Sequence, residues 1–479
     1  MRIISYFKIA KSVRRFNISQ KYVMNKPWAS GGILLLCVII AMLLANLPFT
    51  KEIYQHVLET ELLITIQSPL HEGGTRVIDW AFPNGMNVER FINDILMVVF
   101  FFTVGLEIKR EIICGELSNV KKALLPVVAA AGGMAVPAII FAVLNRGTAA
   151  ASGWGIPTAT DIAFAVGIMS FLGNKVPVSL KIFLTALAIA DDLGAILVVA
   201  FFYGGSVNIM LLATALIILA GVYIMNQFGE KRMIYYLIPA IAVWFLFYYA
   251  GIHATMSGVV MAMMIPMGAR YERAFMDRKL KQYDKRLIAC DKYTDEQEGF
   301  PNEQQRHCIR RISYVCNNSI GMSYRLEHAL NPWVNFVIMP IFALANAGVV
   351  IPDLSYFNIF QYSAEIGSVG MGVFFGLLLG KPLGITIASY IAIKMRIGTM
   401  PAGASWKMLF AVACLGGIGF TMSIFVDTLS FSNVSQYTEH LRSIGKIAVL
   451  MGSLCAGILG SVLITVINKI ENNDQISDK

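Results

Sequence analysis

Long apolar runs dominate the chain and recur from residue 28 almost to its end. Helices are the expected structure, because helices satisfy their backbone groups internally in lipid and the runs lack the alternation of barrel strands. At about 20 residues per crossing, with some runs shorter or interrupted, the pattern predicts an all-α membrane protein of about twelve transmembrane helices. The expected spans are residues 28–47, 92–106, 123–144, 155–172, 180–202, 209–225, 234–250, 254–267, 333–350, 369–393, 408–425 and 447–467.

Composition supports a bilayer environment. With 56% hydrophobic and 14% charged residues, a chain of 479 residues has too little polar surface for a water-soluble protein. The net charge is +9, but the cations lie in clusters rather than along one face, so nucleic acid is not an expected partner. The cysteines show no paired Cys-x-x-Cys spacing, which argues against a disulfide framework or a zinc site.

The cation clusters predict the orientation. The segment 1–27 contains several Lys and Arg residues and no acid, and cations recur after spans two, six and ten. The intervening loops around Gly204, His253 and Asp353 carry none. Because cytoplasmic loops are enriched in Lys and Arg, both termini are expected in the cytoplasm. A cleaved signal peptide is disfavoured, since the first apolar run is too long and no small-x-small site ends it.

The predicted organisation follows these spans: a basic N-terminal segment 1–27, helices one to eight in 28–267, an extended cytoplasmic loop 268–327, helices nine to twelve in 328–468, and a cytoplasmic tail 469–479. The loop is highly charged, which favours a partly disordered or short-helical excursion over a second domain. A regulatory or partner-binding role for it stays open. His307, Cys308 and Cys316 are expected to be ordinary surface residues rather than metal ligands.

Two adjacent acids, Asp191 and Asp192, interrupt span five midway through the membrane. A charge there costs roughly 2.5–3.5 kcal/mol, so few are retained without a purpose. Burial and mutual repulsion favour the protonated form, and Na⁺ binding requires proton release, so a single site can hold either Na⁺ or H⁺. The alternative is that one carboxylate merely pairs with a buried cation to stabilise the fold.

Spans four and eleven contain breaks in their apolar pattern. Span four reads Pro157-Thr-Ala-Thr-Asp-Ile-Ala-Phe-Ala-Val-Gly, and span eleven contains Gly416-Gly-Ile-Gly-Phe-Thr-Met-Ser. Interrupted spans at matching places in two halves are typical of inverted repeats with broken helices, here spans three to five and ten to twelve. Facing half-helix ends need opposite charges, which Asp161 and Lys381 supply. Thr160 and Asp161 as direct cation ligands remain an alternative.

Lys381, in Gly376-Leu-Leu-Leu-Gly-Lys-Pro-Leu-Gly-Ile, is the only cation deep within a predicted span, and Asp191 is its natural partner. Lys381 could either carry a proton during exchange or serve only as a structural support, and both roles stay open.

The chain resembles the NhaA-type sodium/proton antiporters along nearly its whole length. The matching segments are Asn93-Asp94, Val104-Gly-Leu-Glu-Ile-Lys-Arg-Glu, Thr158-Ala-Thr-Asp-Ile-Ala-Phe-Ala, Ala190-Asp-Asp-Leu-Gly-Ala, Gly251-Ile-His-Ala-Thr, Phe342-Ala-Leu-Ala-Asn-Ala-Gly, Gly380-Lys-Pro-Leu-Gly-Ile and Gly417-Ile-Gly-Phe-Thr-Met-Ser. The resemblance implies crossed broken helices four and eleven, Asp192 as the principal Na⁺ and H⁺ carboxylate, Asp191 facing Lys381, and Asp94 on the cation access route. It also implies electrogenic, pH-dependent exchange of internal Na⁺, and of Li⁺, for external H⁺, with no cofactor.

The resemblance further suggests a pH-sensing cluster of Glu107, Arg110, Glu111, Glu327 and His328, although these are also ordinary interfacial charges. Asn331 stands where the family usually has a histidine. His253 is equally compatible with a packed loop residue and a sensor. The segment after Pro48 could pair edge to edge in a homodimer, as in the family.

Other function classes fit less well. A sodium-coupled organic-anion symporter could use broken helices, but the paired acids and Lys381 argue against it. A channel would need a continuous polar path, and nothing resembles a filter ring. An enzyme is not expected, because no nucleophile, nucleotide-binding loop or redox motif interrupts the spans.

Overall fold

The protein is described by a computed structural model over residues 27–62, 64–69, 75–80, 85–204, 207–269, 271–291, 303–351, 354–362, 367–431 and 438–477. The basic leader at 1–26 and Asp353, both used above to predict orientation, lie outside the described residues.

Helices occupy each apolar run that the sequence predicts as a span. In order, they are α2 (Pro27–Asn46), α4 (Val88–Phe91) with η1 (Ile92–Leu96) and α5 (Met97–Cys114), α6 (Val120–Leu144), η3 (Ala149–Thr158) with α7 (Ile162–Leu172), α8 (Val178–Phe202), α9 (Ile209–Gln227), α10 (Ile234–Ala250), α11 (Thr255–Met264), α14 (Met322–Trp333) with η5 (Val334–Ile338) and α15 (Met339–Asn346), α16 (Val369–Phe375) with η7 (Gly376–Gly380) and α17 (Lys381–Lys394), α18 (Trp406–Gly416), α19 (Phe420–Ser430) and α20 (Thr438–Ser477).

The described helices confirm an all-α membrane fold. Nine are long and apolar enough to span a bilayer, and α18 with α19 forms a tenth if the bent pair is one span. The shorter apolar helices α10 and α11 fall at two further predicted spans. Several helices extend beyond the predicted bounds, notably α14, which begins at Met322, and α20, which continues to Ser477.

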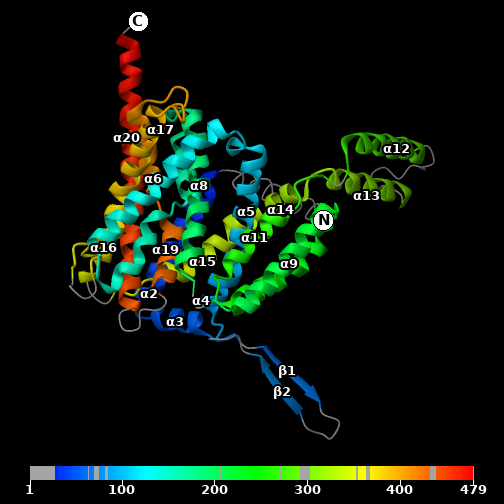
Figure 1. Cartoon of the computed structure of the whole chain (residues 1–479), viewed down its shortest axis with the longest axis horizontal. Coiled ribbons are helices and arrows are strands. Elements are labelled where there is room, and N and C mark those ends of the chain that lie inside the picture. Colours follow the sequence, from blue (N-terminus) through cyan, green and yellow to red (C-terminus); the bar gives the residue numbers. More distant parts are fainter. Residues whose placement is uncertain are drawn as a thin grey trace, which may run out of the picture.

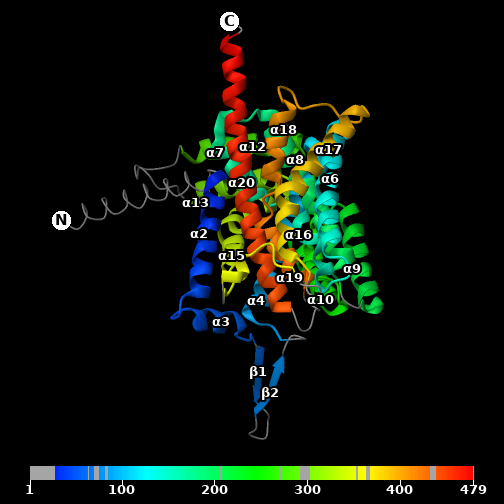
Figure 2. The same cartoon turned by 90° about the vertical axis from the view of Figure 1, so that its left-hand side faces the viewer.

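The helices run side by side as one bundle (Figures 1 and 2). At one end, the short helix α3 (Lys51–Glu59) lies across the bundle, and a hairpin of β1 (Ile64–Pro69) and β2 (Thr75–Trp80) projects away from it. The strands are antiparallel, with Ile64 opposite Trp80 and Pro69 opposite Thr75. At the other end, α12 (Arg273–Asp291) and α13 (Glu303–Asn318) extend sideways, and they occupy part of the charged segment between α11 and α14.

Small residues bring α6 and α17 into close contact. A Cβ added at Gly132 would lie 2.5 Å from the carbonyl oxygen of Gly384 and would also collide with the Ala388 side chain. Glycine here therefore sets the distance between α6 and α17, and α6 also packs against α8.

Gly132→Ala is expected to lower the melting temperature of the purified protein, because overpacking a tight helix contact costs about 1–3 kcal/mol. The matched control is Gly221→Ala in α9, where nothing lies within 4 Å of the added Cβ and alanine has the better helix propensity. Equal melting temperatures for the two variants would contradict this account of the α6–α17 contact.

Two spans are interrupted where the sequence predicts breaks. Span four changes from η3 to α7 through extended backbone at residues 159–161, and span eleven bends by 49° between α18 and α19. The two breaks touch, since the Asp161 N–H donates to the Ile418 carbonyl at 2.7 Å. This contact brings the polar residues of both breaks together next to α8.

Candidate functional site

The two adjacent acids of α8 lie in the interior of the bundle. Asp191 is 0% exposed and Asp192 is 2% exposed. One oxygen of each carboxylate, Oδ1, is buried without a hydrogen-bond partner among the described residues. Buried carboxylate oxygens without a donor are energetically costly unless a proton or a cation occupies them. The site therefore has lone pairs available for an ion.

Lys381 pairs with the first of these acids. Its Nζ lies 2.7 Å from Asp191 Oδ2, and neither side chain is exposed. Nζ also donates to the Thr158 carbonyl at 2.5 Å, at the C-terminal end of η3. A cation is favourable there because unsatisfied carbonyls concentrate negative charge at a helix C-terminus.

A π-helical turn, η7, immediately precedes Lys381. Such turns insert an extra residue and change the direction of the side chains that follow. The direction in which the Lys381 side chain points can therefore not be obtained by assuming regular α-helical spacing through this span.

Thr160 joins α8 to both breaks. Its hydroxyl lies 2.6 Å from Asp191 Oδ2 and 2.8 Å from the Gly416 carbonyl at the end of α18. A hydroxyl has one hydrogen, so it donates to one of these acceptors at a time. Thr160 can thus change its donor direction when Asp191 changes protonation or binds an ion.

Asp161 bridges the second halves of the two broken spans. It caps α7 by accepting from the Phe164 N–H at 3.1 Å, and its Oδ2 accepts from the Thr421 hydroxyl at 2.5 Å and the Thr421 N–H at 3.3 Å in the first turn of α19. A carboxylate at two helix N-termini offsets the positive ends of both.

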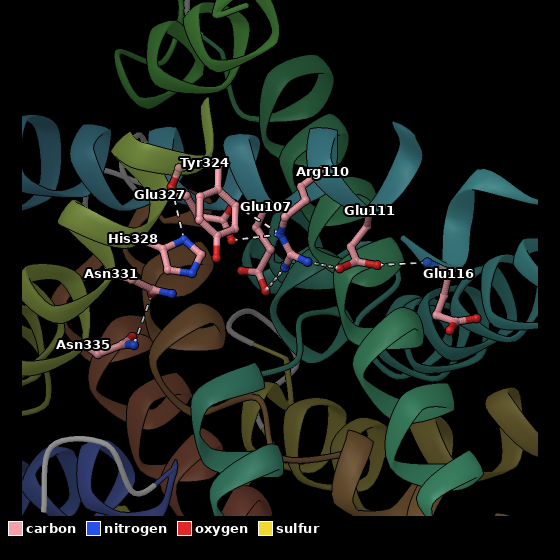
Figure 3. Close-up of polar contacts among 9 residues, drawn as sticks. All are labelled: Glu107, Arg110, Glu111, Glu116, Tyr324, Glu327, His328, Asn331 and Asn335. Atoms are coloured by element: carbon pink, nitrogen blue, oxygen red, sulfur yellow. Dashed lines mark hydrogen bonds and ion pairs between the residues drawn. The ribbon is translucent and has the colours of Figure 1, made fainter. Parts of the chain in front are cut away.

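A second polar cluster surrounds Arg110 at the end of α5 (Figure 3). Arg110 Nε lies 3.0 Å from Glu327 Oε1, Nη1 lies 2.7 Å from Glu111 Oε1, and Nη2 lies 3.8 Å from Glu107 Oε1. The Glu327 side chain is nearly fully buried, whereas Arg110 is about one-third exposed. The structure thus brings together four of the five residues in the suggested pH-sensing cluster, with one cation facing three acids.

His328, the fifth residue, faces a different neighbour. Its ring stacks on Tyr324 at 3.8 Å between centroids, and its Nδ1 lies 3.1 Å from the Tyr324 carbonyl (Figure 3). Asn331 Oδ1 accepts from Asn335 Nδ2 at 3.2 Å. His328 is exposed, and it is not among the described residues that contact Arg110.

Asp94 lies in the π-helical turn η1 and is partly exposed. Its neighbour Asn93 exchanges two amide hydrogen bonds with Asn346 at the end of α15, at 2.8 and 3.1 Å. Asn346 is buried, and its contact with Asn93 in another helix was not predicted from the sequence segment that contains it.

His253 packs in the turn between α10 and α11. Nδ1 lies 2.9 Å from the Thr255 hydroxyl, and the ring meets Phe425 edge-on. Burial lowers the pKa of His253 to about 4, so its ring is neutral near pH 7. These contacts favour the packed-residue interpretation over the sensor.

Sequence reasoning missed a third group of charges. Asp427 near the end of α19 is 0% exposed, and the positive charges of Arg442 and Lys446 in α20 attract it electrostatically. The predicted spans ended at 425 and resumed at 447, which put these residues in a loop. Lys446 lies within a helix that spans the bundle, so Lys381 is not the only cation inside a span.

Comparisons with known proteins show the family to which the chain belongs. The family model described as "Na+/H+ antiporter 1" matches residues 21–464. The chain is 40% identical to a Na⁺/H⁺ antiporter NhaA of Pelagibacter ubique over 94% of its length and 97% of the relative, and 43% identical to one of Oleidesulfovibrio alaskensis over 79% and 81%. An NhaA of Helicobacter pylori is 37% identical over 96% and 98%. With these matches along nearly its entire length, the chain is a multi-pass membrane transporter of the NhaA Na⁺/H⁺ antiporter family.

Proposed function

We propose that this protein extrudes Na⁺, and Li⁺, across a bacterial inner membrane in electrogenic, pH-dependent exchange for external H⁺. The observation that carries the proposal is that Oδ1 of Asp191 and Oδ1 of Asp192, buried where the two broken spans meet, have no hydrogen-bond partner in the part of the chain that the structure describes. Carboxylate oxygens suit a small hard cation, and they must release protons before they bind one. Na⁺ and H⁺ therefore compete for one site, with Asp192 as the principal carboxylate.

Lys381 can couple a second proton to the cycle. Its ammonium neutralises Asp191 at 2.7 Å. Sodium at Asp191 would compete with that ammonium, which favours loss of the Lys381 proton. Exchange then moves more protons than sodium ions, which makes it electrogenic. A Lys381 that keeps its proton throughout would be a strut only.

Thr160 and Asp161 support the site in this proposal. Asp161 compensates the positive ends of α7 and α19, and Thr160 orients Asp191. Alternating access would come from movement of the half-helices around the cation site, where spans four and eleven would cross. Spans three to five would be related to spans ten to twelve by an inverted repeat. Asp94, at the start of span two, would lie on the cation route.

The positive-inside pattern places both termini in the cytoplasm in this proposal. The segments are a basic leader at 1–27, helices one to eight in 28–267, a cytoplasmic loop at 268–327, helices nine to twelve in 328–468, and a tail at 469–479. The ends of α5 and α14, with the Arg110 cluster, then lie at the cytoplasmic mouth.

Transport in proteoliposomes tests the function. Sodium added to one side of a sealed vesicle should dissipate a preformed pH gradient without any organic solute, and a membrane potential should change the rate if exchange is electrogenic. A requirement for an organic anion would instead indicate a symporter.

Glu327→Gln is expected to shift the pH dependence of transport by about half a pH unit or more, since it removes one of three acids that hold Arg110. The measurement is the initial rate from pH 6 to 9 at saturating sodium. Glu116→Gln is the matched control, because that exposed carboxylate lies 3.9 Å from Lys122 rather than against Arg110. Overlapping profiles for wild type and Glu327→Gln would remove this cluster from pH sensing.

We also propose that the β1–β2 hairpin joins two copies into a homodimer, because a projecting two-stranded sheet has edges available for pairing. Deletion of residues 64–80 should convert dimers to monomers in native mass spectrometry. A dimer of unchanged stability would exclude the hairpin as the main contact.

A further inference from the structure

A buried carboxylate lies apart from the exchange site, where α19 packs against α20 (Figure 2). Asp427 is 0% exposed, and neither of its carboxylate oxygens has a hydrogen-bond partner among the described residues. Taking such a group out of water is unfavourable unless opposite charge compensates it.

The compensating charges come from the first turns of α20. The positive charges of Arg442 and Lys446 attract Asp427 electrostatically, but among the described residues neither forms an ion pair with it within 4 Å. Arg442 Nη2 also donates to the carbonyl of Thr428, the residue after Asp427, at 2.8 Å. Lys446 is also attracted electrostatically by Glu89 at the start of span two.

Gly445, between these two cations in sequence, permits the close approach. A Cβ at Gly445 would overlap Oδ1 of Asp427. The α20 backbone therefore packs directly against the carboxylate, and a larger side chain there would push α19 and α20 apart.

The same helix also holds the beginning of α19. Ser453 Oγ in α20 accepts from the Phe420 N–H at 3.1 Å, directly after the break in span eleven. The next residue, Thr421, donates to Asp161. Because an α-helix rises about 1.5 Å per residue, Asp427 lies about 9 Å along α19 from Thr421. Thus α20 contacts α19 near both of its ends. Ser453 of α20 binds Phe420 at the start of α19, and Gly445 of α20 packs against Asp427 near its end.

We propose that Asp427 is a positioning residue for antiport: with Arg442 and Lys446, it fixes α19 against α20 and so sets the direction of Thr421 at the break. The inference depends on the proposed function, in which the two breaks support the cation site. Asp427 contacts neither Asp191 nor Asp192 within the described hydrogen bonds, so its effect is indirect, through α19.

The test compares apparent KM and maximal rate for sodium in proteoliposomes containing the full chain. Asp427→Asn leaves Arg442 and Lys446 facing α19 without an acid, and it should raise the sodium KM about tenfold, since small displacements of a supporting group have large effects. The double variant Asp427→Asn with Lys446→Met restores the net charge of the group, so its KM should return to within about threefold of wild type. Lys469→Met, at an exposed site farther along α20, is the control and should change nothing.

Gly445→Ala provides an independent test that keeps every charge and remains informative if Asp427→Asn fails to fold. It should also raise the sodium KM, because it separates α20 from Asp427. An unchanged KM in either variant, or a double variant no better than Asp427→Asn alone, would overturn the positioning role. Wild-type protein that does not exchange sodium for protons would instead contradict the proposed function, so the two failures are distinguishable.

Discussion

Asp192→Asn should abolish sodium/proton exchange while the protein still inserts and folds. The amide cannot carry the negative charge that binds Na⁺, and it cannot take up or release the exchanged proton. The expected loss is at least about 100-fold, the size typical for removing a group that acts directly on the transported charge. Stability should be retained or increased, because the substitution replaces a buried carboxylate whose Oδ1 has no partner among the described residues, and this removes a desolvation cost.

The measurement is sodium-driven proton movement in proteoliposomes, with the amount of inserted protein and its melting temperature determined in parallel. Asp161→Asn is the comparison, since its one amide oxygen can still accept from either Phe164 or Thr421, and keeping one of these two contacts should preserve part of the activity. Loss of insertion in Asp192→Asn would indicate a structural role for the acid, and normal transport would exclude it as the exchange group.

The positions of the helices could be predicted from the sequence because burial in lipid requires apolar residues over the whole length of a span. The run at 234–250 coincides with α10 (Ile234–Ala250), and the breaks after Pro157 and at Gly416 are visible as small and polar residues inside apolar runs. The pairing of Lys381 with Asp191 followed from charge alone, since a buried cation needs a buried anion.

The rest depends on contacts that hydropathy does not encode. The π-helical turns before Met97 and Lys381 leave no clear mark in composition. Asp427 follows one apolar run and Lys446 precedes the next, where charges usually indicate a loop, but α19 continues to Ser430 and α20 begins at Thr438, so both residues lie in helices. His328 follows Glu327 directly, yet neighbouring helix positions point about 100° apart, and only Glu327 reaches Arg110.

Apparent sodium affinity should rise with pH and then become constant. At low pH the carboxylates of α8 hold protons that sodium must displace, so the apparent Kd should fall about tenfold per pH unit for each proton released on binding. Once the site is fully ionised, no proton is left to displace and the dependence ends. Calorimetry of sodium binding to the purified protein, repeated in buffers of different ionisation enthalpy, measures the protons released. Asp192→Asn serves as the control and should show neither sodium heat nor proton release. The contrary result would be a binding heat that does not depend on the buffer near pH 7, together with a sodium affinity that does not depend on pH below that value. Sodium and protons would then occupy separate sites, and exchange would require a coupling mechanism other than competition at Asp191 and Asp192.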